Sequence, residues 1–418
     1  MRLLRWLSRG SLFTNSAYNL VAILSTALFG FVFWLVGARL YPSSDIGAAQ
    51  IVISAMFGIA AISLLGFNFA IPKFFPDEKE KEMLLGSCLF VSVLVALLGS
   101  GVFALLLDFV LTPQGVFRGA LFSAAFALIT ASWSVGAIMD SFFIAVGDSR
   151  SLFVRNMIIN VAKLCTLFLG LYLGSKMLFF SWGAGSVLSI AAMLFFLPNI
   201  RRFFIPAFSA PLVRKILPLS AGNYFSWGFN YVVALIGLPI LATYWGLDFV
   251  GYFGIAWSIA TVLFIVSSSL SQVLIAEAAN SPQSTPQLVR KSLKYSFAFL
   301  IPAFIATALL RSQVLSFFGP AYPAASDALL VLAFSSLPLA LVNAYIAQKS
   351  ISNNAASIMA INGARLAGFV LCALALTQQY GMVGTAAAWL FANLAICPFA
   401  IAAFFAPAKA VAVGKSKS

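Results

Sequence analysis

Residues 153–174 read FVRNMIINVAKLCTLFLGLYLG and carry one ammonium group, Lys163, near the middle of a largely apolar stretch. A helix needs about 20 residues to span the hydrocarbon core of a bilayer, so this stretch is long enough to cross one. A Lys or Arg at the centre of such a helix costs about 2.5–3.5 kcal/mol on insertion scales, and it marks a functional position by default. Lys163 is therefore the first candidate for a functional residue.

The whole chain has the composition of a membrane protein. Of its 418 residues, 62% are hydrophobic and 9% are charged, whereas soluble domains carry about 25% charged residues. Apolar runs of about 20 residues recur along the sequence, and each predicts a membrane-spanning helix. The runs cover residues 14–38, 46–71, 83–107, 119–146, 152–173, 177–198, 217–241, 250–276, 292–315, 325–348, 356–376 and 382–406. We expect an all-α polytopic membrane protein with twelve transmembrane helices and short connections.

A second cation, Arg365, occupies the matching place in the eleventh predicted span. MIINVAKL (157–164) aligns with MAINGARL (359–366), and Lys163 falls on Arg365 at an offset of 202 residues. The match suggests that the fifth and eleventh spans are copies of one ancestral segment.

A second pair of matching segments supports an internal repeat. SAYN (16–19) aligns with SAGN (220–223) at an offset of 204 residues, so Asn19 falls on Asn223. At the same offset Gly47 falls on Gly251. Each half holds an even number of spans, so the halves share one orientation and a pseudo-two-fold axis along the membrane normal. We predict two six-helix bundles, residues 1–204 and 205–418, around a central cavity.

The two membrane cations predict an anion site. If Lys163 and Arg365 both face the pseudo-axis, they form a cationic spot at mid-depth in a wet cavity. The alternative is a structural ion pair between Lys163 and Asp140, which lies in the adjacent fourth span. Arg365 has no comparable acidic candidate in its own half.

Three further residues are weaker candidates for substrate binding. Asn19 and Asn223 line the cavity in one interpretation and hydrogen-bond between helices in the other. Arg39 lies at the outer end of the first span, where it contacts lipid headgroups or stands at the cavity mouth.

The distribution of charge predicts the orientation in the membrane. Most of the 25 Lys and Arg residues, Arg155 among them, are assigned to the termini and to the loops that follow even-numbered spans. The positive-inside rule then places both termini in the cytoplasm. The net charge of +14 is thereby explained by topology and contact with membrane lipids rather than by nucleic acid. The chain has no His, and its four Cys lie in predicted spans without CxxC spacing, so no metal site, disulfide framework or cofactor is expected.

Three stretches resemble bacterial polysaccharide exporters. They are SLFTNSAYNLVAILSTALFGFVFWLVGARLYPSSDIGAAQI (11–51), DSFFIAVGDSRSLFVRN (140–156) and LPLSAGNYFSWGFNYV (217–232). They are similar to the O-antigen flippases of the multidrug/oligosaccharidyl-lipid/polysaccharide (MOP) superfamily. The resemblance implies a multi-pass protein of the bacterial cytoplasmic (inner) membrane that serves the biosynthesis of lipopolysaccharide or another surface polysaccharide.

The resemblance also implies a substrate and a mechanism. Family members move a lipid-linked oligosaccharide, usually on polyprenyl pyrophosphate, to the outer leaflet by alternating access. Their cavities tend to be cationic, which would suit Lys163 and Arg365, although no family motif specifies these two positions. Transient contact with the polysaccharide polymerase machinery is an expected partnership.

Alternative functions differ in the residues they need. A multidrug exporter of the same superfamily binds cations through buried carboxylates, and Asp140 is the only carboxylate well inside a predicted span. A membrane glycosyltransferase or polymerase needs catalytic bases and sizeable loops, but this chain has no His and 11 acidic residues. A flippase for the peptidoglycan precursor stays open. No Gly-rich phosphate loop is present, so ATP hydrolysis is not expected, and coupling to Na⁺ or H⁺ is left open.

Overall fold

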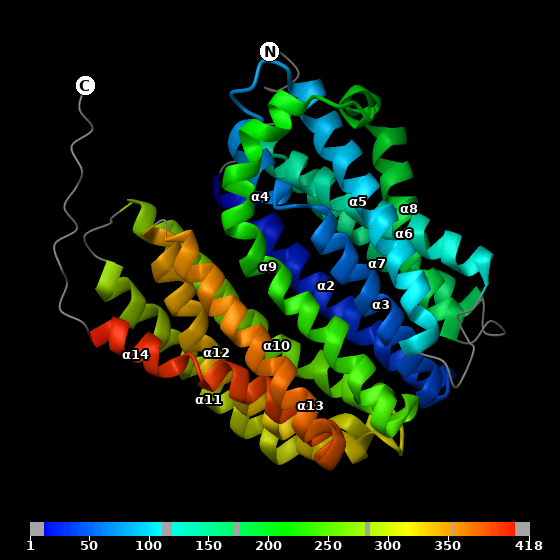
Figure 1. Cartoon of the computed structure of the whole chain (residues 1–418), viewed down its shortest axis with the longest axis vertical. Helices are drawn as coiled ribbons and strands as arrows, with labels where there is room; N and C mark the ends of the chain where they lie inside the picture. The colour runs from blue at the N-terminus through cyan, green and yellow to red at the C-terminus, as the bar shows by residue number, and fades with distance from the viewer. Residues whose placement is uncertain (1–11, 111–118, 170–174, 281–284, 353, 406–418) are drawn as a thin grey trace.

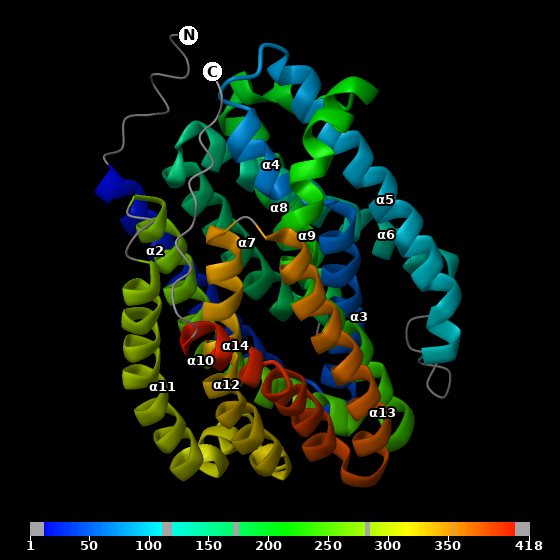
Figure 2. The same ribbon diagram turned by 60° about the vertical axis from the view of Figure 1, so that its left-hand side comes forward.

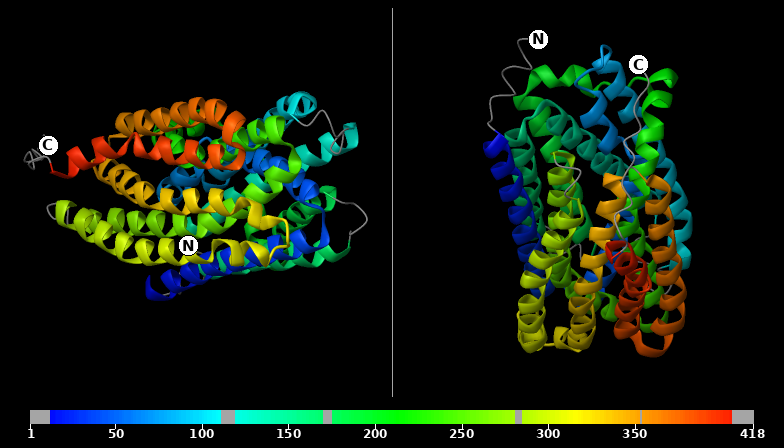
Figure 3. Two further views of the ribbon diagram at one scale, coloured as in Figure 1. Left: turned by 90° about the horizontal axis from the view of Figure 1, so that it is seen from below. Right: turned by 90° about the vertical axis from the view of Figure 1, so that its left-hand side faces the viewer.

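The computed structural model describes residues 12–110, 119–169, 175–280, 285–352 and 354–405. Over these residues the chain forms helices joined by short turns, and it contains no strand. The long helices run roughly parallel to one another (Figure 3). The all-α fold predicted from hydropathy is thereby confirmed.

The first half of the chain forms the helices that correspond to predicted spans one to six. They are α2 (Leu12–Leu40), α3 (Ser43–Ser63), α4 (Phe67–Phe74), α5 (Lys81–Val110), α6 (Ala120–Val146), α7 (Ser149–Leu169) and α8 (Ser175–Phe196). The second predicted span is broken into α3 and α4, because Leu65 and Gly66 have positive φ angles of 46° and 81°. Left-handed backbone cannot continue a right-handed helix, so α4 continues this span as a separate short element.

The first half ends with a 3₁₀ turn, and the second half forms longer helices. The elements are η2 (Pro198–Phe204), α9 (Ala210–Trp245), α10 (Leu247–Asn280), α11 (Thr285–Ser316), η4 (Tyr322–Ala325), α12 (Ser326–Ile351), α13 (Ala355–Leu394) and α14 (Cys397–Phe405). The helix α13 turns back on itself at Gly381, where φ is 53° and ψ is −127° (Figure 2). Only glycine adopts this backbone at little cost, and the turn separates predicted spans eleven and twelve.

Each of the twelve predicted spans therefore falls on a helical segment. Among the described residues, nine helices are long and apolar enough to cross a membrane. One of these, Ala356–Phe404, contains both of the last two predicted spans, and the described parts of α2 and α9 add the shorter apolar pieces Ser25–Leu40 and Leu235–Trp245. The chain is thus a multi-pass membrane protein.

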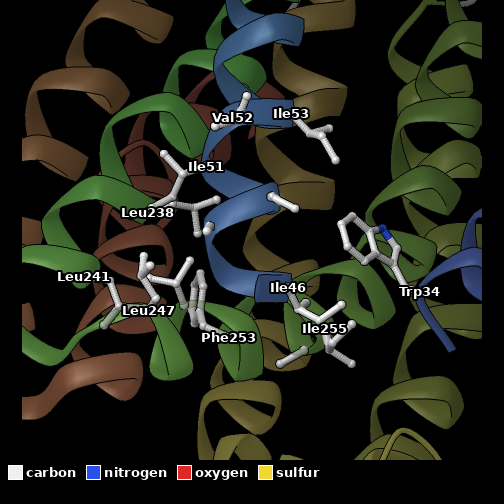
Figure 4. Packing of buried hydrophobic residues seen from close by; sticks show 14 of the residues in the cluster. Trp34, Ile46, Ile51, Val52, Ile53, Leu238, Leu241, Leu247, Phe253 and Ile255 are labelled. Atoms are coloured by element: carbon white, nitrogen blue, oxygen red, sulfur yellow. The ribbon is translucent and has the colours of Figure 1, made fainter. Parts of the chain in front are cut away.

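The helix α3 lies at the centre of the molecule, and α11 lies at its edge. In the apolar membrane-spanning stretch of α3, 83% of the residues are buried inside the protein. In that of α11, only 11% of the residues are buried. In Figure 1 the helices α2–α8 lie on one side and α10–α14 on the other, with α9 between them. The helix α3 packs against α9 and α10 as well as against α5, α6 and α8. Figure 4 shows Ile51 of α3 beside Leu238 of α9, and Ile46 beside Ile255 of α10, all in one hydrophobic cluster.

Candidate functional site

The N-terminal turns of α3 and α10 touch backbone to backbone. A Cβ atom at Gly47 would collide with the carbonyl oxygen of Leu247, and one at Gly251 would collide with that of Ser43. The contact is reciprocal, since Ser43 precedes Gly47 by four residues, as Leu247 precedes Gly251. Small residues let two membrane helices approach closely without loss of packing. The Ser43 hydroxyl also donates to Oδ1 of Asp248 at 2.5 Å.

Arg39 makes a further bond between the two sides of the molecule at this end. Its Nε and Nη2 atoms donate to the carbonyl oxygen of Phe317 at 2.8 Å and 2.5 Å. Phe317 follows the last residue of α11, so Arg39 satisfies one of the carbonyl groups that every helix leaves unpaired at its C-terminus. Arg39 is exposed, and it does not line the cavity described next. Its predicted substrate contact therefore stays a prediction. We call the group Arg39, Ser43, Gly47, Asp248 and Gly251 the closed end.

A cavity of about 160 Å³ begins one helical turn from the closed end. It receives side chains from α2, α3, α8, α9, α10 and α13, and so from both sides of the molecule. Its aromatic lining residues are Trp34, Phe57, Trp182, Phe253, Trp257 and Phe369. Its polar lining side chains are Gln50, Ser54, Ser258 and Thr385. No charged side chain lines the cavity among the residues that the structure describes.

Two donors at the cavity have no acceptor within the described part of the protein. Gln50 is 6% exposed, and its Nε2 atom makes no hydrogen bond. The indole Nε1 of Trp182 is buried and has no partner either. Buried donors are almost always satisfied. In this conformation neither nitrogen is open to the cavity, so each becomes available to a ligand only when its side chain turns toward it.

Lys163 lies directly behind the cavity wall. Its side chain is 1% exposed, and its ammonium group lies 4.3 Å from the ring centre of Trp182 and 5.8 Å from that of Phe33. A desolvated cation over a tryptophan face gains about 2 kcal/mol. Among the described residues no carboxylate forms an ion pair with Lys163. The Trp182 ring thus contacts Lys163 and also lines the cavity.

Arg365 has a similar position on the other side of the molecule. It is 2% exposed, and its Cζ atom lies 5.5 Å from the ring centre of Trp389. Its Nη1 donates to Oδ1 of Asn362 at 3.0 Å. Trp389 in turn contacts Trp257, which lines the cavity, with 5.4 Å between ring centres. Both cations therefore lie behind aromatic rings, and their predicted contact with the ligand stays a prediction.

Asp140 pairs with Arg155 and not with Lys163. Nε of Arg155 donates to Oδ1 of Asp140 at 2.6 Å, and Nη2 donates to Oδ2. The proposed Lys163–Asp140 pair is wrong because Lys163 lies eight residues further along α7, about 12 Å along the helix. The assignment of Arg155 to a loop is also wrong, since it lies within α7, is 3% exposed and packs against Gly136.

Comparison with known proteins places the chain in a family. Residues 12–275 match the family described as polysaccharide biosynthesis protein. The chain belongs to this family. None of the curated protein sequences matches it significantly.

Solved structures share the fold of this polysaccharide biosynthesis family member. The lipid II flippase MurJ in an inward closed conformation has a TM-score of 0.71 and 14% identity, over 92% of this chain and 86% of that one. A multidrug resistance MATE family transporter of the MOP superfamily in an inward-facing conformation has a TM-score of 0.65 and 14% identity, over 91% and 93%. The outward-facing conformation of a MATE family transporter gives a TM-score of 0.61 and 12% identity, over 96% of each chain. The predicted superfamily is confirmed, and these relatives are transporters rather than enzymes.

The aromatic wall of this family member and Gln50 were not singled out from the sequence. Asn19 and Asn223 were predicted as candidates, and they lie among residues whose side chains the structure does not describe. One signal could have located the wall. At the offset of 204 residues that aligns Gly47 with Gly251, Ser54 falls on Ser258, and both serines line the cavity.

Proposed function

We propose that this protein is a flippase that moves a lipid-linked oligosaccharide across the bacterial inner membrane, for the synthesis of O-antigen or another surface polysaccharide. The observation that carries the proposal is the cavity between the two sides of the molecule. Its lining combines aromatic rings with neutral amide and hydroxyl groups, which suits a glycan. The family assignment to polysaccharide biosynthesis supports the same substrate class.

The two buried cations suit the carrier part of such a lipid. A pyrophosphate cannot enter hydrocarbon alone, because the cost of removing an unpaired charge from water is prohibitive. Lys163 and Arg365 place positive charge beside the cavity in a medium of low dielectric constant, where electrostatic attraction is strong. The prenyl chain of the carrier stays in the lipid, so only the polar head passes through the protein.

The closed end provides the structural basis for alternating access. Under the positive-inside orientation both termini are cytoplasmic and the closed end faces outward. Release of the glycan to the outside then requires α3 and α10 to separate at Gly47 and Gly251, with loss of the Arg39–Phe317 and Ser43–Asp248 bonds. Rocking of one bundle against the other is the usual way in which transporters built from repeats achieve this.

A specific observation argues against export of cationic drugs. Such substrates need a free buried carboxylate, and none lines the described cavity. Asp140 is neutralised by Arg155. A flippase for the peptidoglycan precursor shares the carrier chemistry and is the main alternative.

Complementation in bacteria separates these functions. The gene is expressed in one strain that lacks its O-antigen flippase, in a second whose peptidoglycan-precursor flippase can be depleted, and in a third sensitive to cationic dyes. We expect surface polysaccharide to return in the first strain, with no rescue of the second and no dye resistance in the third. Rescue of the second strain alone, or dye resistance alone, would replace the proposed function by the corresponding alternative.

A further inference from the structure

We propose that the cavity next to the closed end binds one uncharged sugar ring of the transported glycan, with Gln50 and Trp182 as its hydrogen-bond donors. The inference rests on the proposed function and makes it more specific. The cavity binds a neutral sugar of the substrate, and the charged carrier group binds elsewhere in the protein.

The absence of charge in the described lining indicates the kind of group that binds. A sugar acid or an amino sugar would bring a charge against a described lining that is neutral, where no charged side chain can contact it directly, since Lys163 and Arg365 lie over the rings of Trp182 and Trp389. The ammonium group of Lys163 lies over the Trp182 ring, and Lys163 does not line the cavity. Neutral hexoses and N-acetylhexosamines meet no such penalty.

The two unsatisfied donors indicate which helices hold the ring. Gln50 lines the cavity from α3 and Trp182 from α8, so a single acceptor-rich ligand can take a hydrogen bond from each when the two side chains turn toward it. Sugar hydroxyl and acetamide oxygens are suitable acceptors. The Ser258 hydroxyl donates to the carbonyl oxygen of Gly254 at 2.8 Å, which leaves its lone pairs free to accept from a sugar hydroxyl.

The aromatic lining and the size of the cavity fit a single ring. The Trp182 ring is held edge-on by Phe57, with 5.3 Å between ring centres and an angle of 89°. The apolar C–H faces of a pyranose pack well on aromatic rings of this kind. The volume of about 160 Å³ is below the roughly 300–1,000 Å³ of sites for drug-sized ligands, so the cavity has room for about one sugar residue.

Direct binding of free sugars to the full-length protein in nanodiscs tests the inference. Saturation-transfer NMR titrations compare glucose, galactose and N-acetylglucosamine with glucuronic acid and glucosamine. The variants are Gln50→Met, which keeps side-chain length, and Trp182→Phe, which keeps a ring. Trp133→Phe is the matched control, because Trp133 also has a buried indole N–H without a described partner and contacts Trp182 but does not line the cavity. Gel filtration and helix content confirm that each variant is folded.

We expect at least one neutral sugar to bind and the charged sugars to bind more weakly. Loss of one neutral hydrogen bond should raise the Kd about 3- to 10-fold in Gln50→Met and in Trp182→Phe. The control should stay within about 2-fold of the unmodified protein, below the smallest of these effects. Unchanged affinity in both cavity variants, tighter binding of glucuronic acid, or no binding of any sugar would overturn the inference.

The same preparation separates this inference from the proposed function. A protein that moves a lipid-linked glycan in vesicles but binds no free neutral sugar keeps its function and loses the subsite. A protein that binds neutral sugar through Gln50 and Trp182 but moves no lipid-linked glycan keeps the subsite and loses the function.

Discussion

The side-chain amide of Gln50 in α3 lies against Gly254 in α10, so close that a Cβ atom at residue 254 would collide with it. Gly254 is the residue that falls on Gln50 at the 204-residue offset. The absence of a side chain at Gly254 thus makes room for that of Gln50, at two positions that the predicted repeat would make equivalent.

Gly254→Ala should therefore displace the Gln50 amide without unfolding the protein, because the obstructing atoms are the flexible end of a side chain. We expect its sugar affinity and transport rate to fall to about those of Gln50→Met. Gly101→Ala in α5 is the control, since nothing lies within 4 Å of a Cβ atom there. If Gly254→Ala transports and binds sugar as well as Gly101→Ala, the amide is not held where the structure places it.

Gly47→Ala should open the closed end. Its Cβ atom would meet backbone atoms of α10, which cannot move aside without separating the two helices. A cysteine placed at Ser258, in a background without the four native cysteines, reports access to the cavity from outside. We expect Gly47→Ala to speed its modification by a membrane-impermeant thiol reagent in cells. Equal rates with and without Gly47→Ala would show that this contact does not control access.

The reciprocal contact at Gly47 and Gly251 supports the predicted pseudo-two-fold relationship, which the alignment of MIINVAKL with MAINGARL first indicated. Hydropathy could locate the spans, because lipid demands about 20 apolar residues for each crossing. It also placed the turn at Gly381 between the last two predicted spans. It could not locate the break at Leu65, which lies inside one apolar run and depends on local backbone angles.

The candidate site could be predicted only in part. Lys163 and Arg365 stand out because charge is rare inside a span. The rings of Trp182 and Trp257 do not stand out, because aromatic residues that face a cavity and those that face lipid look alike in sequence. The partner of Asp140 depends on which helix faces pack together, and spacing along the chain does not determine it.

Asp140→Asn should destabilise the fold. It leaves the Arg155 guanidinium, which is 3% exposed, without its counter-charge. We expect a loss near the lower end of the 3–5 kcal/mol measured for broken buried pairs, about 3 kcal/mol, because Asp140 itself is 27% exposed. Thermal unfolding in detergent measures the loss.

The double variant Asp140→Leu, Arg155→Met tests whether this pair is structural. Apolar replacement of both partners should restore much of the stability, and transport should then return. A stable double variant that does not transport would assign Asp140 to ion coupling instead.

The Glu78–Lys215 pair should make a small, pH-dependent contribution. Nζ of Lys215 donates to Oε2 of Glu78 at 2.6 Å, between the α4–α5 connection and the start of α9. This bond holds the pKa of Glu78 below its ordinary value of 4.5. The stabilisation is therefore full above pH 4.5 and is lost as the pH falls through the lowered pKa.

Glu78→Gln should accordingly lower the melting temperature slightly at pH 7, and the difference should shrink as the pH drops below 4.5. The effect should stay below about 1 kcal/mol, because Lys215 is 53% exposed and solvent screens the pair. A difference that grows on acidification would show that another group is responsible.

Lys163→Met and Arg365→Met should each slow the movement of a pyrophosphate-linked lipid while preserving insertion, because an apolar side chain costs nothing in a membrane helix. We expect at least about a 10-fold loss for each variant, which corresponds to about 1.4 kcal/mol of lost attraction. Full activity in the double variant would show that the cations serve packing against Trp182 and Trp389 only.

The initial rate of translocation in proteoliposomes tests the central claim most directly. The vesicles contain the purified protein and a polyprenyl-pyrophosphate-linked oligosaccharide labelled on its glycan, and a membrane-impermeant glycosidase reports how much has crossed. The account predicts a rate clearly above that of protein-free vesicles, reduced by Gln50→Met and by Lys163→Met. A rate equal to that of protein-free vesicles, from protein shown to be folded and inserted, would contradict it.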